Sequence, residues 1–282
     1  MFGQFISDLM NYAFLQNALI TSIIVGVTCG IIGSFITLKG MSLIGDAISH
    51  AVLPGVAISY MIGINFFYGA VVAGLLTALG INYVDQKSRI KSDSAIGIVF
   101  SAFFALGVIL MQKAQSAIDL SSILFGNVLT VSNTDRYITM AVGLLVVLVV
   151  LLFYKELLIT TFDPTMAKAY GLPVDLINYG IMILLTLVSV ASLQTVGVIL
   201  VVALLITPAS TAYLLTSNLT KMIVLSALLG AIAAVAGLYF SFAYNLPSGA
   251  VIVLAAATMF ILAFLFSPKQ GLVWRKIKYN HQ

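Results

Sequence analysis

Two ionisable residues, Asp46 and His50, lie four positions apart in an apolar stretch, residues 45–55, which reads GDAISHAVLPG. On a helix, residues four apart share one face, with Cβ atoms roughly 6 Å apart. A carboxylate and an imidazole at that spacing can bind one divalent cation, and Mn²⁺, Fe²⁺ and Zn²⁺ accept such an oxygen and nitrogen pair. Because ionisable residues inside a bilayer are costly, this pair is the candidate metal site.

A simpler interpretation gives the pair a structural role only. Asp46 follows a short loop and could cap the N-terminus of a helix, while His50 could be a buried neutral histidine bonded to a backbone carbonyl. Against this interpretation, the same span contains no Lys or Arg that could pair with the carboxylate. A carboxylate buried without a counter-ion is expensive, and a cation in transit would supply the missing charge.

The composition is that of an integral membrane protein. Of its 282 residues, 61% are hydrophobic and only 8% are charged, against about 25% charged residues in an ordinary soluble domain. The net charge of +4 is therefore no indication of nucleic-acid binding. Residues 1–17 contain no Lys or Arg, so the basic start of a cleavable signal peptide is missing and the first apolar segment is expected to remain as a span. The single cysteine, Cys29, excludes a disulfide within the chain and disfavours a thiolate metal cluster.

Nine segments are long and apolar enough to cross a membrane, which needs about 20 residues. They are residues 13–38, 44–63, 65–84, 94–111, 137–154, 177–193, 195–216, 221–242 and 249–267. Pro54 and Pro208 lie inside spans and should kink them or interrupt their hydrogen-bond ladders. The chain is thus expected to form one all-α transmembrane domain over residues 1–282.

The positive residues predict the orientation of this domain. With the N-terminus outside and the C-terminus inside, only Lys113 and Arg136 of the 13 Lys and Arg residues lie outside. The opposite orientation would invert that distribution. We therefore expect the N-terminus to face the exterior and the C-terminus to face the cytoplasm.

Two loops are long enough to form structure. The outer loop, about residues 112–136, is expected to contain a short surface helix over residues 119–126. In the inner loop, about residues 155–176, Asp163 and Pro164 form a helix start, and Gly171 followed by Pro173 forms a helix stop. A short helix at the inner face, with Met166, Ala167 and Tyr170 on one side, is expected to dock on a partner. The alternative is a simple amphipathic connector.

Pairs of small residues four apart, such as Gly26 with Gly30 and Ser226 with Gly230, predict close packing of membrane helices. The chain has no Walker-type glycine-rich Lys-Ser/Thr motif and therefore does not bind ATP by that route. One Asp and one His are too few ligands for a selective metal site. Two copies related by a two-fold axis would supply two of each, which predicts a homodimer with the pathway on its axis.

These segments resemble a known family. Residues 45–55 are similar to the characteristic segment of permease subunits of metal ABC importers of the manganese/zinc/iron type, most like the manganese members. Residues 161–173, TFDPTMAKAYGLP, resemble the coupling helix of that family, and residues 204–212, LLITPASTA, resemble one of its late spans. Ser210 and Thr211 depart from the alanine-rich form of that last segment. The resemblance covers about residues 10–267.

The resemblance implies a polytopic helical bundle like that of a type II ABC importer, in the plasma membrane of a bacterium. It implies a permease homodimer, two cytoplasmic ATP-binding subunits and an extracytoplasmic metal-binding protein. The chain would carry Mn²⁺, with Fe²⁺ and Zn²⁺ as alternatives, by alternating access. It would itself be neither an enzyme nor the holder of a permanent cofactor.

The resemblance also implies a role for each candidate residue. Asp46 and His50 would bind the ion in transit, and Pro54 and Pro208 would serve as kinks for gating. The outer helix at 119–126 would help to receive the metal. Coupling to the ATPase would fall to Asp163, Pro164, Ala167, Tyr170 and Gly171.

Two other functions use the same residues. A stand-alone secondary transporter could couple metal to protons through Asp46 and His50. An intramembrane metalloenzyme is a third reading, but it lacks a nucleophile, a general base beyond Asp46 and a third protein ligand.

Overall fold

The computed structural model describes residues 2–114 and 128–267, and this part of the chain folds into helices without a strand. Eight of the helices are long and apolar enough to cross a membrane. They are α2 (Ala13–Leu38), α5 (Phe66–Lys87), α6 (Ser92–Lys113), α8 (Asn133–Leu152), α11 (Val174–Val196), α12 (Val198–Leu215), α13 (Leu219–Tyr244) and α14 (Ser248–Phe266). Each corresponds to one of the predicted spans, so the all-α membrane architecture is confirmed.

The remaining predicted span, residues 44–63, is a helix in two pieces. It consists of α3 (Ile44–Ala51) and α4 (Leu53–Ile62), which are separated at Val52. Pro54 is one of the first residues of α4, and it lacks the N–H that would bond the carbonyl of His50. By contrast, α12 runs through Pro208 without interruption.

Two further features differ from the sequence-based prediction. A short helix, α1 (Phe2–Asn11), precedes the first span. The start of the predicted inner loop is helical, because α9 (Tyr154–Phe162) follows α8 after a break at Phe153. The predicted outer helix at 119–126 lies outside the described residues, and the 3₁₀ turn η1 (Val128–Thr130) follows it.

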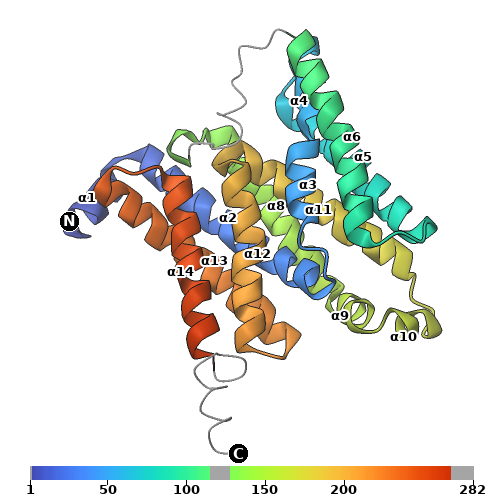
Figure 1. Ribbon diagram of the computed structural model, residues 1–282. Helices are drawn as coiled ribbons and strands as arrows, with labels where there is room; N and C mark the ends of the chain where they lie inside the picture. The colour runs from blue at the N-terminus through green and yellow to red at the C-terminus, as the bar shows by residue number, and fades with distance from the viewer. Residues whose placement is uncertain (1, 115–127, 268–282) are drawn as a thin grey trace, which may run out of the picture.

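The helices form two groups that share α11 (Figure 1). In one group α2 packs against α12 and α13, and α14 packs against both of these. In the other, α3, α4, α5 and α6 pack against one another. Helix α11 contacts α2 and α8 on one side and α3 and α5 on the other, so it joins the two groups.

The packing of α2 against α13 depends on glycine. The backbones of Gly26 and Gly230 approach so closely that a Cβ added to Gly230 would lie 2.2 Å from the carbonyl oxygen of Gly26. One turn away, the Ser226 hydroxyl donates a 2.8 Å hydrogen bond to the carbonyl oxygen of Gly30. Without a hydrophobic force between helices in lipid, such close contacts are a main source of association. The predicted small-residue packing is therefore confirmed.

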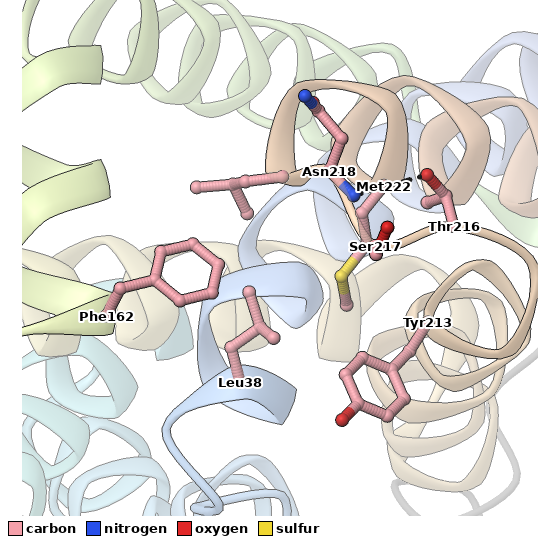
Figure 2. A pocket seen from close by; sticks show the side chains of 8 residues that line it. Leu38, Phe162, Tyr213, Thr216, Ser217, Asn218 and Met222 are labelled. Carbon is pink, nitrogen blue, oxygen red and sulfur yellow. Dashed lines mark hydrogen bonds between the residues drawn. The ribbon is translucent and has the colours of Figure 1, made fainter.

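A pocket of about 370 Å³ opens where the ends of α2, α9, α12 and α13 meet. Figure 2 shows the Phe162 ring and Leu38 on one side of it, with Tyr213, Thr216 and Asn218 on the other. Phe162 is the last residue of α9 and is separated from the short helix α10 (Pro164–Ala169) by Asp163 alone. The pocket and α10 therefore adjoin one another at the same end of the bundle.

The close approach of α2 and α13 leads to a stability prediction. Gly230→Ala should lower the free energy of unfolding by about 1–3 kcal/mol, the usual cost of overpacking, because its new methyl group would meet backbone atoms. Thermal unfolding of the detergent-solubilised protein would measure this loss. The control is Gly180→Ala in α11, where an added Cβ meets nothing within 4 Å. Equal melting temperatures for the two variants would contradict the packing described.

Candidate metal site

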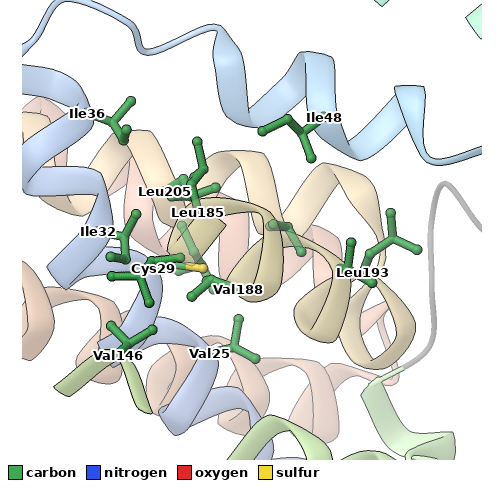
Figure 3. Close-up of a cluster of buried hydrophobic side chains, with 14 of the residues drawn as sticks. Val25, Cys29, Ile32, Ile36, Ile48, Val146, Leu185, Val188, Leu193 and Leu205 are labelled. Atoms are coloured by element: carbon green, nitrogen blue, oxygen red, sulfur yellow. The ribbon is translucent and has the colours of Figure 1, made fainter. Parts of the chain in front are cut away.

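The candidate metal site lies on α3, whose packing leaves one strip of its surface partly exposed. Ile44, Ala47, Ile48 and Ala51 are all buried, and α3 packs against α11 and α12. In Figure 3, Ile48 extends from α3 toward the buried cluster that contains Leu205 and Leu193. The opposite strip, about half a turn away, carries Asp46 and His50.

The two candidate ligands point at one another. Nε2 of His50 lies 3.5 Å from Oδ1 of Asp46, and the side chains are 24% and 47% exposed. That separation is too long for a good N–H···O hydrogen bond, which falls between 2.7 and 3.2 Å. It is compatible with two ligands of one cation: with metal–ligand bonds of about 2.1 Å, it corresponds to a ligand–metal–ligand angle of roughly 110°, close to a tetrahedral site, and an octahedral ion would draw the two atoms closer together. The side chains could therefore bind one ion with little rearrangement.

The capping interpretation of Asp46 is wrong. The residue that precedes α3 is Leu43, and no side chain caps this helix end. Asp46 is the third residue of the helix, where a carboxylate still interacts favourably with the helix dipole but does not fill the cap position. Capping therefore does not explain why a carboxylate occupies this position.

Among the described residues, Asp46 and His50 are a pair of candidate ligands with no third one beside them. Within residues 2–114 and 128–267, no group of three His, Cys, Asp or Glu side chains is placed to hold an ion. Cys29 is fully buried in the core beside Ile32 and Val188, as Figure 3 shows, and behaves as a small apolar residue. That a complete site needs a second copy of the chain therefore stays a prediction.

Lys39, at the end of α2, is the cation nearest in sequence to the site, but it binds elsewhere. Its ammonium donates a hydrogen bond to the side-chain oxygen of Asn178 on α11. Partial burial lowers the pKa of Lys39 from its usual value. In the described part of the chain, the carboxylate of Asp46 has an ion-pair contact with His50 alone.

Sequence reasoning missed the aromatic neighbours of His50. The rings of Phe100 and Phe104 on α6 have their centroids 6.1 and 6.0 Å from that of the imidazole. Their spacing of four residues shows that they share a face of α6. Nothing in the sequence, however, indicates that this face lies opposite a residue fifty positions earlier.

The predicted inner-face helix forms as α10. The carboxylate of Asp163 accepts a 2.8 Å hydrogen bond from the N–H of Met166, and Pro164 is the first helical residue. Gly171 ends the segment with a φ of +78°, a left-handed conformation that glycine adopts without strain. The start and stop signals of the sequence are confirmed.

The prediction that Ala167 shares a face with Met166 and Tyr170 is wrong. Ala167 is fully buried, whereas Met166 and Tyr170 are 47% and 68% exposed. Since α10 packs against α9 and α11, Ala167 forms its inner face and the other two form its outer face. Ala167 therefore belongs to the packing of α10 and not to a docking surface.

Comparison with known proteins identifies the family. The ABC 3 transport family matches residues 11–267. The chain is 62% identical to the manganese transport system membrane protein MntC of Listeria monocytogenes, over 96% of this chain and 97% of that protein. It is 54% identical to the manganese import system permease protein ScaB of Streptococcus gordonii, over 99% and 100% of the two chains.

A solved structure agrees with the sequence comparisons. A chain of PsaBC from Streptococcus pneumoniae, determined in complex with Fab, superposes with a TM-score of 0.88 at 54% identity. The match covers 99% of this chain and 100% of that one. The family match, the relatives and the fold all agree: this chain belongs to the ABC 3 transport family.

Proposed function

We propose that the chain is the permease subunit of an ATP-binding cassette importer that carries Mn²⁺ into the cell. Asp46 and His50 bind the ion in transit, in a site shared between two copies of the chain. Support comes from the family, from relatives named as manganese transport proteins, and from the geometry of the site. Family membership favours an ABC permease over a stand-alone, proton-coupled transporter.

The observation that carries the proposal is the convergence of the two side chains. An oxygen and a nitrogen 3.5 Å apart lie on the partly exposed strip of a helix whose other faces are packed. The pair is too far apart to be a strong hydrogen bond and well placed for a shared cation. A bound divalent ion would also offset the cost of holding a carboxylate within an apolar span.

The ligand chemistry favours a hard or borderline ion. Two carboxylates and two imidazoles from a pair of chains suit Mn²⁺, and they accept Fe²⁺ or Zn²⁺ as well. Because Zn²⁺ generally binds such sites more tightly than Mn²⁺, it should compete with Mn²⁺. The single cysteine is buried in the core, which disfavours a soft ion such as Cu⁺.

The helix α10 is the proposed contact with the cytoplasmic ATPase subunit. Its outer face presents Met166 and Tyr170, and exposed Phe162 at the adjoining pocket extends this apolar surface. Asp163, Pro164 and Gly171 fix the ends of the helix and so hold that face in place. With the C-terminus inside, α10 lies at the cytoplasmic side, and an extracytoplasmic protein would deliver metal to the opposite side.

The break at Val52 is the proposed hinge of the permease. It separates α3, which carries both ligands, from α4, so the two pieces can change their relative angle without unfolding either one. Pro54 maintains the break because it cannot donate a backbone hydrogen bond. Pro208 lies in a continuous helix, and we assign it no comparable role.

Replacing the carboxylate tests the metal site. Asp46→Asn keeps the size and polarity of the side chain but removes one negative charge from each chain. Uptake of radiolabelled Mn²⁺ in cells should fall by more than the roughly 10- to 100-fold typical of losing an outer partner of a metal ligand. His50→Gln should have the same effect. Both variants should match the wild type in membrane abundance and melting temperature, and near-normal uptake by Asp46→Asn would remove the basis of the proposal.

Replacing the outer face of α10 tests the coupling assignment. Tyr170→Ser should weaken co-purification with the ATPase subunit about tenfold or more, as large aromatic residues often do at interfaces, and should lower metal-stimulated ATP hydrolysis. Tyr244→Ser is the control, because Tyr244 is similarly exposed but ends α13. If both substitutions have the same effect, or neither has any, α10 does not contact the ATPase through Tyr170.

A further inference from the structure

We propose that Phe100 and Phe104 are positioning residues that hold the His50 imidazole where its Nε2 faces Asp46. The inference rests on the proposed metal site and adds residues that belong to a different helix. Neither phenylalanine can bind a metal, so their contribution would act through the imidazole.

The three rings form one cluster. The imidazole and the Phe104 ring are perpendicular, with centroids 6.0 Å apart, and the Phe100 ring is tilted by 57° at 6.1 Å. The two phenylalanine rings are themselves 5.7 Å apart. All three separations fall in the range of favourable aromatic pairs. The two rings therefore pack beside the imidazole, whose Nε2 lies 3.5 Å from Oδ1 of Asp46.

The backbone of α6 fixes the position of these rings. Gly107 packs directly on the break between α3 and α4, where an added Cβ would lie 2.7 Å from Cβ of Leu53 and 2.9 Å from Cδ of Pro54. Phe104 lies one turn before Gly107, and Phe100 lies one turn further. The close approach at Gly107 thus brings both rings to the level of His50 on the neighbouring helix.

Restricting the His50 side chain to one rotamer matters for metal affinity. A helical side chain has two common χ1 rotamers, and an ion binds only where the imidazole and the carboxylate converge. A freely rotating His50 would have to be ordered during binding, which weakens affinity. Because each of two chains supplies one imidazole, the loss occurs twice in a shared site.

The test uses the full chain, purified with its ATPase subunit in nanodiscs, and measures the rise in melting temperature as Mn²⁺ is added. Phe104→Leu should raise the Mn²⁺ concentration needed for a given rise in melting temperature by about 10- to 100-fold. Phe104→Tyr keeps the ring and should stay within about threefold of the wild type, since the aromatic contact is retained. Phe100→Leu provides a second variant if Phe104→Leu is too unstable to purify.

Phe103→Leu is the matched control. Phe103 is the neighbour of Phe104 on α6, but it lines an apolar groove against α4 and α5 with Pro54 and Tyr68. Its substitution should leave the Mn²⁺ response unchanged, although it alters the melting temperature without metal. The inference is overturned if Phe104→Leu responds to Mn²⁺ like the wild type, or if Phe103→Leu shows an equal loss of Mn²⁺ response. It is also overturned if Phe104→Tyr responds to Mn²⁺ as weakly as Phe104→Leu.

Failure of this inference can be told apart from failure of the proposed function. If Asp46→Asn and His50→Gln abolish the Mn²⁺ response while Phe104→Leu leaves it unchanged, the metal site stands and the positioning role falls. If Asp46→Asn and His50→Gln respond like the wild type, the metal site itself is wrong, and the positioning role falls with it.

Discussion

The cost of holding a carboxylate within an apolar span is the constraint on which this structure depends. Asp46 has an ion-pair contact with His50 alone among the described residues, and 3.5 Å is too long for that contact to be a strong hydrogen bond. Lys39 is engaged by Asn178 instead. The carboxylate therefore has no strong ion-pair partner among the described residues, and the cation of the proposed transport site would supply the missing charge.

The rest of the fold holds this charge in place and connects it to the inner face. Helix α3 packs against α5, α6, α11 and α12, so the proposed ligands lie on a helix that cannot rotate freely. Helix α11 begins at Val174, shortly after α10 ends at Ala169, and it contacts both α10 and α3. A displacement of α10 by a partner therefore has a continuous packed route, through α11, to the residues proposed to bind the ion.

Much of this arrangement follows from local sequence, and the remainder depends on packing. Hydropathy predicts the spans because a bilayer sets their length, and helical periodicity places Asp46 beside His50. The ends of α10 follow from Asp163 and Gly171, whose effects are local. The burial of Ala167 and the rings opposite His50 depend on contacts between helices distant in sequence, which a single sequence does not show. Helix α9 follows a span directly, and hydropathy alone does not distinguish it from a loop that leaves the membrane. The sequence-based prediction therefore missed it.

The number of ions bound by a pair of chains tests the account most directly. A purified complex, loaded with Mn²⁺ and freed of excess ion, can be analysed for metal by mass spectrometry. A shared site predicts one tightly bound ion for every two permease chains. It also predicts that a mixed complex, in which only one of the two chains carries His50→Ala, loses that ion almost completely. One ion per chain, or retention of half of the metal by the mixed complex, would show that each chain binds Mn²⁺ by itself and would contradict the shared site.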